Sequence, residues 1–372
     1  MTPGAGNYVG GPMAFDPAWA AAPDMQDFED FFSLDENCFL SYSGRSAFAT
    51  ALDEMIPAGR HVLVPDFICG DVMLPRLRER RIDFKFYPVS EDLGIDRDSL
   101  WPALRGNPAA IVLVNYFGLC DWAPLAERIR ASFDDILIIA DNVQAMYDTS
   151  AREWADVTFS SFRKFLSVPD GAITRMRRPV SPALESPDNN QALAMHIAAA
   201  SLRHAFLNHG YTDDDRDRIE KTYLKLFADA SRLFPSAPMS MSRFSRFMIN
   251  KFPLQAYAEQ RTANYRYLAA RLDGIEPLNV LRPEIADAAV PMALPVLAPD
   301  GWRDGLLAEL RGQGIFCPVH WPLAFDHANQ SGPGCQALAR QIFSVPIDQR
   351  YDPPSLERVA VSIEAFCEKR EN

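Results

Sequence analysis

The sequence predicts an α/β protein with a mostly parallel central sheet in a large domain and a smaller α+β domain at the carboxy terminus. Strand-like runs alternate with helical patterns over the first half of the chain, which is typical of a parallel sheet covered on both faces. The last third changes to short strands and helices in mixed order. With 372 residues and 48% hydrophobic content, the chain is long enough to form two lobes.

The large domain is predicted from its apolar runs. The run AAIVLVNY is continuously apolar and suits a central strand that is buried on both faces. The expected strands cover residues 61–65, 83–88, 109–116, 135–141 and 156–161, and the expected helices between them cover 72–80, with Pro75 in the first turn, and 122–133. Amphipathic helices are expected at 191–206, 217–233 and 250–272.

The two ends of the chain differ in character from this middle part. Residues 1–38 are rich in Gly, Ala and Pro and predict an extended arm with a short helix near 25–32, of a kind that often packs on a partner subunit. The large domain is expected over 39–250, and a linking helix with the small domain over 251–372. The small domain should contain strands at 289–297 and 314–320 and helices at 302–311 and 355–368.

Composition excludes several classes of protein. No stretch approaches the roughly 18 apolar residues that a membrane span needs, and the start of the chain lacks a secretory pattern. The net charge of −12 disfavours a nucleic-acid partner. Six cysteines without paired spacing indicate neither a metal site nor a disulfide framework. We therefore expect reduced thiols and a cytoplasmic protein.

Lys164 stands in an unusual place for a lysine. It follows the strand expected at 156–161, and carboxyl ends of strands are where α/β sheets bind ligands. Phenylalanine, leucine and valine side chains surround it in the sequence, and burial among them lowers the pKa of an amine and makes it a nucleophile that can form a Schiff base. The alternative is a solvated lysine in a loop.

Two further signals precede Lys164. Residues 43–46 (SGRS) open a helix whose free N–H groups, with Ser43, Arg45 and Ser46, would suit a phosphate; the alternative is a plain N-cap at Ser43. Asp141 emerges directly from the buried strand DILIIAD, and the alternative is a cap of the next helix. Pyridoxal phosphate (PLP) needs a phosphate site, a carboxylate for its ring nitrogen and a lysine, in this case about two dozen residues after the carboxylate.

The flanking residues resemble fold-type I PLP enzymes, and among them the DegT/DnrJ/EryC1/StrS sugar aminotransferases. The resemblance runs from about residue 41 to 351 and rests on SGRSAFATAL, VPDFICGDVMLP, VNYFGLCDWAPL, IADNVQAM, FSSFRKFLSVPDGA, GIFCPVHWPL and SVPIDQRYD. It implies the aspartate aminotransferase-like fold and a homodimer with shared active sites. The roles that it implies are a Schiff base at Lys164, a ring-nitrogen contact from Asp141, a ring-oxygen contact from Gln144, a phosphate site at Ser43, Gly44, Arg45, Ser46, Ser160 and Ser161, and ring stacking by Phe67.

The chain also departs from the family pattern. The loop FSSFRK is shorter between the phosphate-binding serine and the lysine than the family's loop, and Gly171-Ala172 stands where a glycine pair is usual. Tyr116 or Phe117 could replace Phe67 as the stacking ring. The partner-subunit asparagine motif has no clear counterpart, and Ser245, Arg246 and Asn250 are the candidates for it.

The resemblance implies an aminotransferase that moves an amino group from a small-molecule donor, glutamate or glutamine, to a keto or aldehyde acceptor such as a nucleotide-linked keto sugar, through a Lys164 aldimine. Arg45, Arg163 and His320 could meet anionic substrate groups. One alternative is a PLP enzyme of elimination, dehydration or carbon–carbon bond formation on an amino acid. Another is a catalytically idle binding or regulatory subunit. Sugar dehydratases of the family carry histidine in place of the lysine, so Lys164 argues against that branch.

Overall fold

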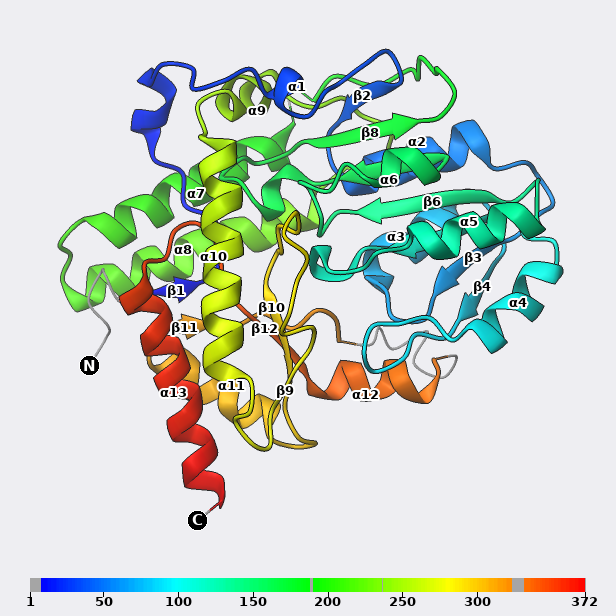
Figure 1. Cartoon of the computed structure of the whole chain (residues 1–372). Coiled ribbons are helices and arrows are strands. Elements are labelled where there is room, and N and C mark those ends of the chain that lie inside the picture. Colours follow the sequence, from blue (N-terminus) through cyan, green and yellow to red (C-terminus); the bar gives the residue numbers. More distant parts are fainter. Residues whose placement is uncertain (1–7, 188–189, 236, 323–330, 372) are drawn as a thin grey trace.

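A seven-stranded sheet forms the centre of the large lobe in the computed structural model (Figure 1), which describes residues 8–187, 190–235, 237–322 and 331–371. The strand order is β2-β8-β7-β6-β5-β3-β4, and every neighbouring pair is parallel except those that involve β8. The strands are β2 (Cys38–Ser41), β3 (Val62–Pro65), β4 (Phe84–Tyr87), β5 (Ala110–Val114), β6 (Leu137–Asn142), β7 (Val157–Ser160) and β8 (Ala172–Met176). The predicted mostly parallel sheet is confirmed.

Helices cover both faces of this sheet. The chain order runs from β5 through β6 to β7 in one direction and from β3 to β4 in the other, so right-handed crossovers place the connecting helices on opposite faces. On one face α2 (Gly44–Met55) packs on α3 (Gly70–Glu79), and on the other α5 (Ala123–Ser132) packs on α6 (Ala151–Trp154), with α4 (Arg97–Arg105) nearby (Figure 1). The helix α3 begins earlier than expected, so Pro75 lies inside it rather than in its first turn.

The smaller lobe follows the long helix α10 (Leu254–Leu272). It contains an antiparallel sheet of β9 (Asn279–Val280), β10 (Leu294–Leu297) and β12 (Ile342–Val345), together with α11 (Arg303–Gly312), α12 (Pro333–Gln341) and α13 (Pro353–Glu371). The strands expected at 289–297 and 314–320 are shorter in the structure, at β10 and at β11 (Ile315–Phe316). This lobe has a hydrophobic core of its own, to which α10, α13 and the strands contribute.

Three more helices complete the large lobe. A helical hairpin of α7 (Gln191–Asn208) and α8 (Asp213–Arg232) leaves the sheet, and α9 (Arg243–Ile249) leads into α10. Thr212 caps α8, which explains why this helix begins before the expected residue 217. None of the helices in the described ranges has the length and hydropathy that a membrane crossing requires.

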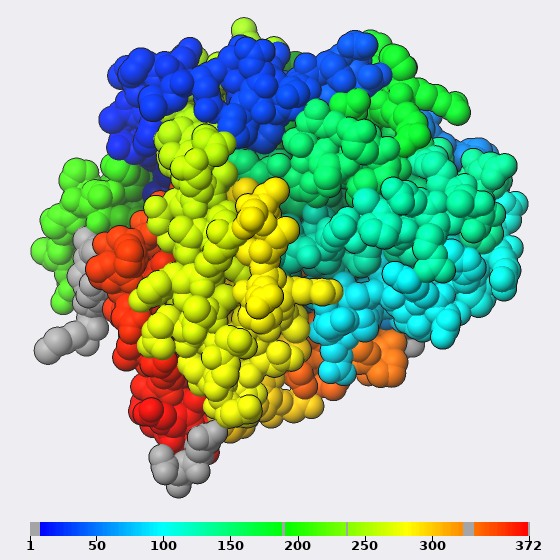
Figure 2. Space-filling view, viewed as in Figure 1, coloured from blue at the N-terminus to red at the C-terminus, as the bar shows by residue number. Residues whose placement is uncertain are grey.

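The amino-terminal arm packs on its own chain. Its strand β1 (Val9–Gly10) pairs with β11 of the small lobe, and its helices η2 (Pro17–Ala21) and α1 (Phe28–Phe31) lie on the large lobe. Val9 belongs to the core of the small lobe, whereas Phe15 and Phe28 belong to the core of the large lobe. Figure 2 shows the arm in blue across the top of the molecule. The arm therefore bridges the two lobes; residues 1–7 of the predicted arm lie outside the described residues.

Candidate active site

Residues that are far apart in the sequence meet at one cavity of about 180 Å³. The start of α2 contributes Ser43, Gly44 and Arg45, the end of β6 contributes Asp141, and the segment after β7 contributes Ser161, Arg163 and Lys164. All three segments follow carboxyl ends of mutually parallel strands, so the sheet delivers them to the same edge. The structure thus brings together the three signals that the sequence suggested.

Lys164 ends η4 (Phe162–Lys164), a short turn directly after β7. The N–H groups of Phe165 and Leu166 both donate to the carbonyl of Phe162, at 2.9 and 2.8 Å, which closes the turn. Burial lowers the pKa of the Lys164 amine below its ordinary value; the Cys69 thiol and the Asp141 charge oppose this shift, and Arg163 adds to it. A larger share of this amine is therefore neutral than in a solvated lysine.

Asp141 is buried with its carboxyl group at the cavity wall. One oxygen, Oδ1, accepts a hydrogen bond of 3.0 Å from the N–H of Val143. Burial raises the pKa of Asp141 to about 6, while the bond from Val143 and the charge of Lys164 oppose the rise. The next helix, α6, begins only at Ala151, so Asp141 closes a turn after β6 and the predicted helix cap is wrong. Within the described residues, no donor to the second carboxylate oxygen is found.

The start of α2 borders the cavity with its amino-terminal end. Ser43 caps the helix, with its Oγ accepting from the N–H of Ser46 at 3.2 Å, so the N-cap interpretation of Ser43 is confirmed. The N–H groups of Gly44 and Arg45 have no partner within the described residues and lie at the positive end of a twelve-residue helix. A Cβ on Gly44 would stand 2.5 Å from Cγ1 of Val143, so only glycine lets the helix start approach the β6 loop this closely.

Two arginines add to this positive field. The guanidinium groups of Arg45 and Arg163 lie over the ring of Phe234, with Cζ 5.7 and 4.2 Å from its centre. Among the described residues neither has a carboxylate partner. Burial, followed by the charge of Arg45, lowers the pKa of Arg163 to about 10. A dianion in the cavity would relieve the repulsion between the two groups.

Some predicted residues lie away from the cavity. Ser46 Oγ hydrogen-bonds the backbone of Met239, and Ser160 Oγ accepts from the N–H of Ile173 at 3.2 Å. Gln144 Oε1 accepts from a backbone N–H at 2.8 Å, and its buried Nε2 has no partner within the described residues. Ser161, in contrast, lines the cavity.

The aromatic candidates lie in the core. Phe67, Tyr116 and Phe117 are each at most 1% exposed, and none of them lines the cavity. The hydroxyl of Tyr116 donates to the carbonyl of Phe67 at 2.6 Å, and the Phe67 ring packs 5.6 Å from that of Trp321. Trp321 and Cys69 line the cavity instead.

The remaining candidates have structural partners. Ser245 donates to the buried carboxylate of Asp170, Arg246 pairs with Glu29, and Asn250 Oδ1 accepts from the N–H of Phe28 at 3.0 Å. His320 Nδ1 lies 2.9 Å from Ser344 Oγ, and burial, followed by the charge of Lys164, lowers its pKa to about 3. Within the described ranges, no group of three or more His, Cys, Asp or Glu side chains is arranged to hold a metal ion.

No family model and no curated protein matches this sequence. Solved structures do match it along nearly its whole length. PseC of Helicobacter pylori, an aminotransferase involved in the biosynthesis of pseudoaminic acid, is 13% identical with a TM-score of 0.68, and covers 98% of this chain and 100% of its own. The chain has the fold of these aminotransferases.

Two further structures agree with this assignment. Spr1654 of Streptococcus pneumoniae in its PLP form is 15% identical with a TM-score of 0.66, over 97% of this chain and 93% of that one. A DegT DnrJ EryC1 StrS aminotransferase from Brucella abortus is 17% identical with a TM-score of 0.61, over 97% and 92%. The predicted fold-type I architecture is therefore confirmed.

Proposed function

We propose that this chain is a PLP-dependent aminotransferase that moves an amino group from glutamate or glutamine to a keto or aldehyde acceptor. The observation that carries this proposal is the convergence of Lys164, Asp141 and the amino-terminal end of α2 on one cavity. The shared fold supports it, because similar structures include aminotransferases and one in a PLP form.

The residues present fit PLP. The free N–H groups at the start of α2, the hydroxyl groups of Ser43 and Ser161, and the guanidinium groups of Arg45 and Arg163 suit its phosphate. Asp141 suits the ring nitrogen. Gln144 does not line the cavity, so its contact with the ring oxygen stays a prediction. The ring-stacking role predicted for Phe67 passes in our proposal to Trp321, which lines the cavity.

When bound, PLP supplies an aldehyde that takes up the amino group and a ring that accepts electrons. Lys164 contributes an amine whose lowered pKa leaves it able to attack a carbonyl and, once released, to accept and return a proton at Nζ. The buried carboxylate of Asp141 would keep a proton on the ring nitrogen. Phe48, Val143 and Phe159 form apolar walls that exclude water from these groups.

A nucleotide-linked keto sugar is the acceptor that we propose, on the strength of the motif resemblance and of the likeness to PseC. A cytoplasmic location fits six cysteines that are free thiols in the structure. We further propose a homodimer, since the fold-type I enzymes that this sequence resembles build their active sites across a dimer interface. Light scattering that found only a 41.6 kDa species at micromolar concentration would contradict the dimer.

Spectroscopy separates the proposed function from its alternatives. Purified protein with PLP should show an absorbance band near ~420 nm, which Lys164→Ala should lack. Glutamate or glutamine should then convert the band to the amino form of the cofactor in one turnover. Binding without conversion by any common donor would favour elimination or carbon–carbon chemistry. Absence of the band in the intact protein would favour an idle binding subunit.

A further inference from the structure

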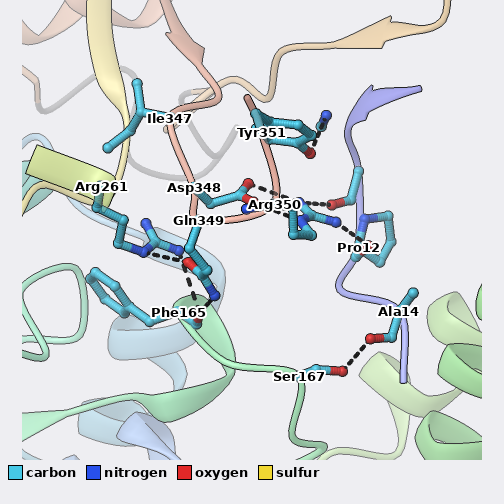
Figure 3. Close-up of polar contacts among 12 residues, drawn as sticks. Pro12, Ala14, Phe165, Ser167, Arg261, Ile347, Asp348, Gln349, Arg350 and Tyr351 are labelled. Carbon is cyan, nitrogen blue, oxygen red and sulfur yellow. Dashed lines mark hydrogen bonds and ion pairs between the residues drawn. The ribbon is translucent and has the colours of Figure 1, made fainter. Parts of the chain in front are cut away.

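The backbone carbonyl that follows Lys164 is held by the other lobe. Phe165 O accepts a hydrogen bond of 2.8 Å from Gln349 Nε2 and one of 3.4 Å from Arg261 Nη2 (Figure 3). Arg261 belongs to α10, and Gln349 belongs to the loop between β12 and α13, so both donors come from the small-lobe side of the chain. Carbonyls at the end of a single turn have no partner inside that turn, and the small lobe supplies one here.

Arg261 and Gln349 fix one another. Arg261 Nε donates to Gln349 Oε1 at 2.8 Å, and Arg261 Nη1 donates to the carbonyl of Met292 at 3.1 Å. The guanidinium carbon lies 4.7 Å from the centre of the Phe165 ring. Arg261 is 1% exposed, so its guanidinium group interacts with these protein groups rather than with water. The pair therefore forms a rigid clamp on residue 165.

The amino-terminal arm also contacts the lysine loop and the loop that carries Gln349. Ser167 Oγ donates to the carbonyl of Ala14, and Arg350 donates to the carbonyls of Pro12 and Gly11 at 3.1 and 3.3 Å (Figure 3). Arg350 is itself held by the buried carboxylate of Asp348, with a bond of 2.6 Å. The lysine loop, the arm and the loop 348–350 thus form one hydrogen-bonded unit.

We infer that Gln349 and Arg261 are positioning residues for Lys164, which couple the small lobe to the direction in which the amine points. This inference rests on the proposed function. A short turn such as η4 is not stable by its own hydrogen bonds, so the peptide plane after Lys164 needs an external partner. Two donors to the carbonyl of Phe165, one of them a charged guanidinium group, favour a single conformation of this peptide plane.

The clamp also determines the surroundings of the amine. The groups that act on Lys164 come from every element packed around it: Cys69 from the start of α3, Arg163 from η4, Asp141 from β6, Arg45 from α2, and His320 from the segment after β11. Burial is the largest influence on its pKa and lowers it. If the loop loosens, water reaches the amine and stabilises its charged form, so the pKa rises.

Competitive labelling with acetic anhydride across pH tests this without any cofactor. Mass spectrometry of the Lys164 peptide in the cofactor-free protein gives the pH at which labelling reaches half its maximum. In Gln349→Met this midpoint should rise by about one unit, which corresponds to a roughly tenfold lower neutral fraction at neutral pH. Gln349→Glu keeps an acceptor for Arg261 but loses the donor to Phe165, so it should shift the midpoint in the same direction.

Arg271→Met is the matched control. Arg271 lies on the same helix as Arg261, but it pairs with Glu357 and Glu364 at the surface, away from Lys164. This variant should leave the midpoint unchanged, and thermal unfolding should show that all variants are folded. An unchanged midpoint in both folded Gln349 variants would overturn the inference. Failure of PLP to attach to Lys164 would instead contradict the proposed function. The labelling result does not depend on that outcome, because the labelling uses the cofactor-free protein.

Discussion

The guanidinium carbon of Arg163 lies 4.2 Å from the centre of the Phe234 ring, and that of Arg45 lies 5.7 Å from the same centre. Two cations thus lie over the same aromatic ring at the wall of the cavity. Cation–π contacts contribute about 0.5–2 kcal/mol each and offset only part of the repulsion and of the loss of hydration. The two neighbouring cations should therefore lower the stability of the cofactor-free protein and favour the binding of a dianion.

Arg163→Met should therefore have opposite effects on stability and on cofactor binding. The free energy of unfolding of the cofactor-free protein should rise by about 1 kcal/mol, because a buried cation is removed. The dissociation constant for PLP should rise about 10- to 100-fold, because a charge-assisted hydrogen bond to phosphate is lost. Denaturant unfolding and fluorescence titration measure the two effects. The exposed Arg340→Met should change neither, and a destabilised Arg163→Met with normal affinity would contradict this account.

Asp141→Asn should stabilise the cofactor-free protein in a pH-dependent way. The pKa of Asp141 is raised to about 6 in the folded state, above the ordinary value near ~3.9. Folding therefore favours the protonated acid, and this advantage is lost as pH rises from about 4 to 6. The gain from asparagine should be near zero at pH 4 and about 2 kcal/mol at pH 8. Urea unfolding at the two pH values checks this, and equal gains at both would argue against a buried Asp141.

Gly44→Ala should weaken PLP binding about tenfold, because the new Cβ would push the stiff Val143 side chain or shift the helix start. Val143→Ala removes the atom that the new Cβ would meet. The double variant should recover most of the lost affinity, which a double-mutant cycle measures as a coupling energy. If the two effects are simply additive, the contact is not what requires glycine at this position.

Two adjacent serines provide a matched pair. Ser161→Ala should raise the PLP dissociation constant several-fold with little effect on stability, because Ser161 lines the cavity. Ser160→Ala should lower the free energy of unfolding by about 1 kcal/mol with unchanged affinity, because the N–H of Ile173 loses its acceptor. Calorimetry measures the stability of both variants, and titration measures their affinity for PLP. A loss of affinity in Ser160→Ala with a loss of stability in Ser161→Ala would contradict these two roles.

The sequence predicted the parallel strands and the central residues of the site for a shared reason. Strands β5 and β6 are long apolar runs, and Asp141 and Lys164 follow strand ends, so local patterns carry both facts. The strands β2 and β8 were not predicted. They pair with one another across more than a hundred residues, and CFLS and AITRM are too short to stand out from turns.

The residues that form the cavity wall were harder to predict than Asp141 and Lys164. Phe67 follows β3 as expected, but its ring packs on Tyr116 in the core, and Cys69 reaches the cavity instead. Trp321 comes from the other lobe, and Phe234 follows the α7–α8 hairpin, so only the tertiary arrangement brings them to Lys164. The clamp of Arg261 and Gln349 on Phe165 is invisible in the sequence for the same reason.

Borohydride reduction of the protein mixed with PLP tests the central claim most directly. Peptide mapping by mass spectrometry should find the reduced cofactor attached to Lys164 in the intact protein, at close to one equivalent per chain. Lys164→Arg should carry no such label, and glutamate added before reduction should abolish it by converting the cofactor to its amino form. Labelling of other lysines to the same extent, or a label at Lys164 that no amino donor removes, would contradict the account.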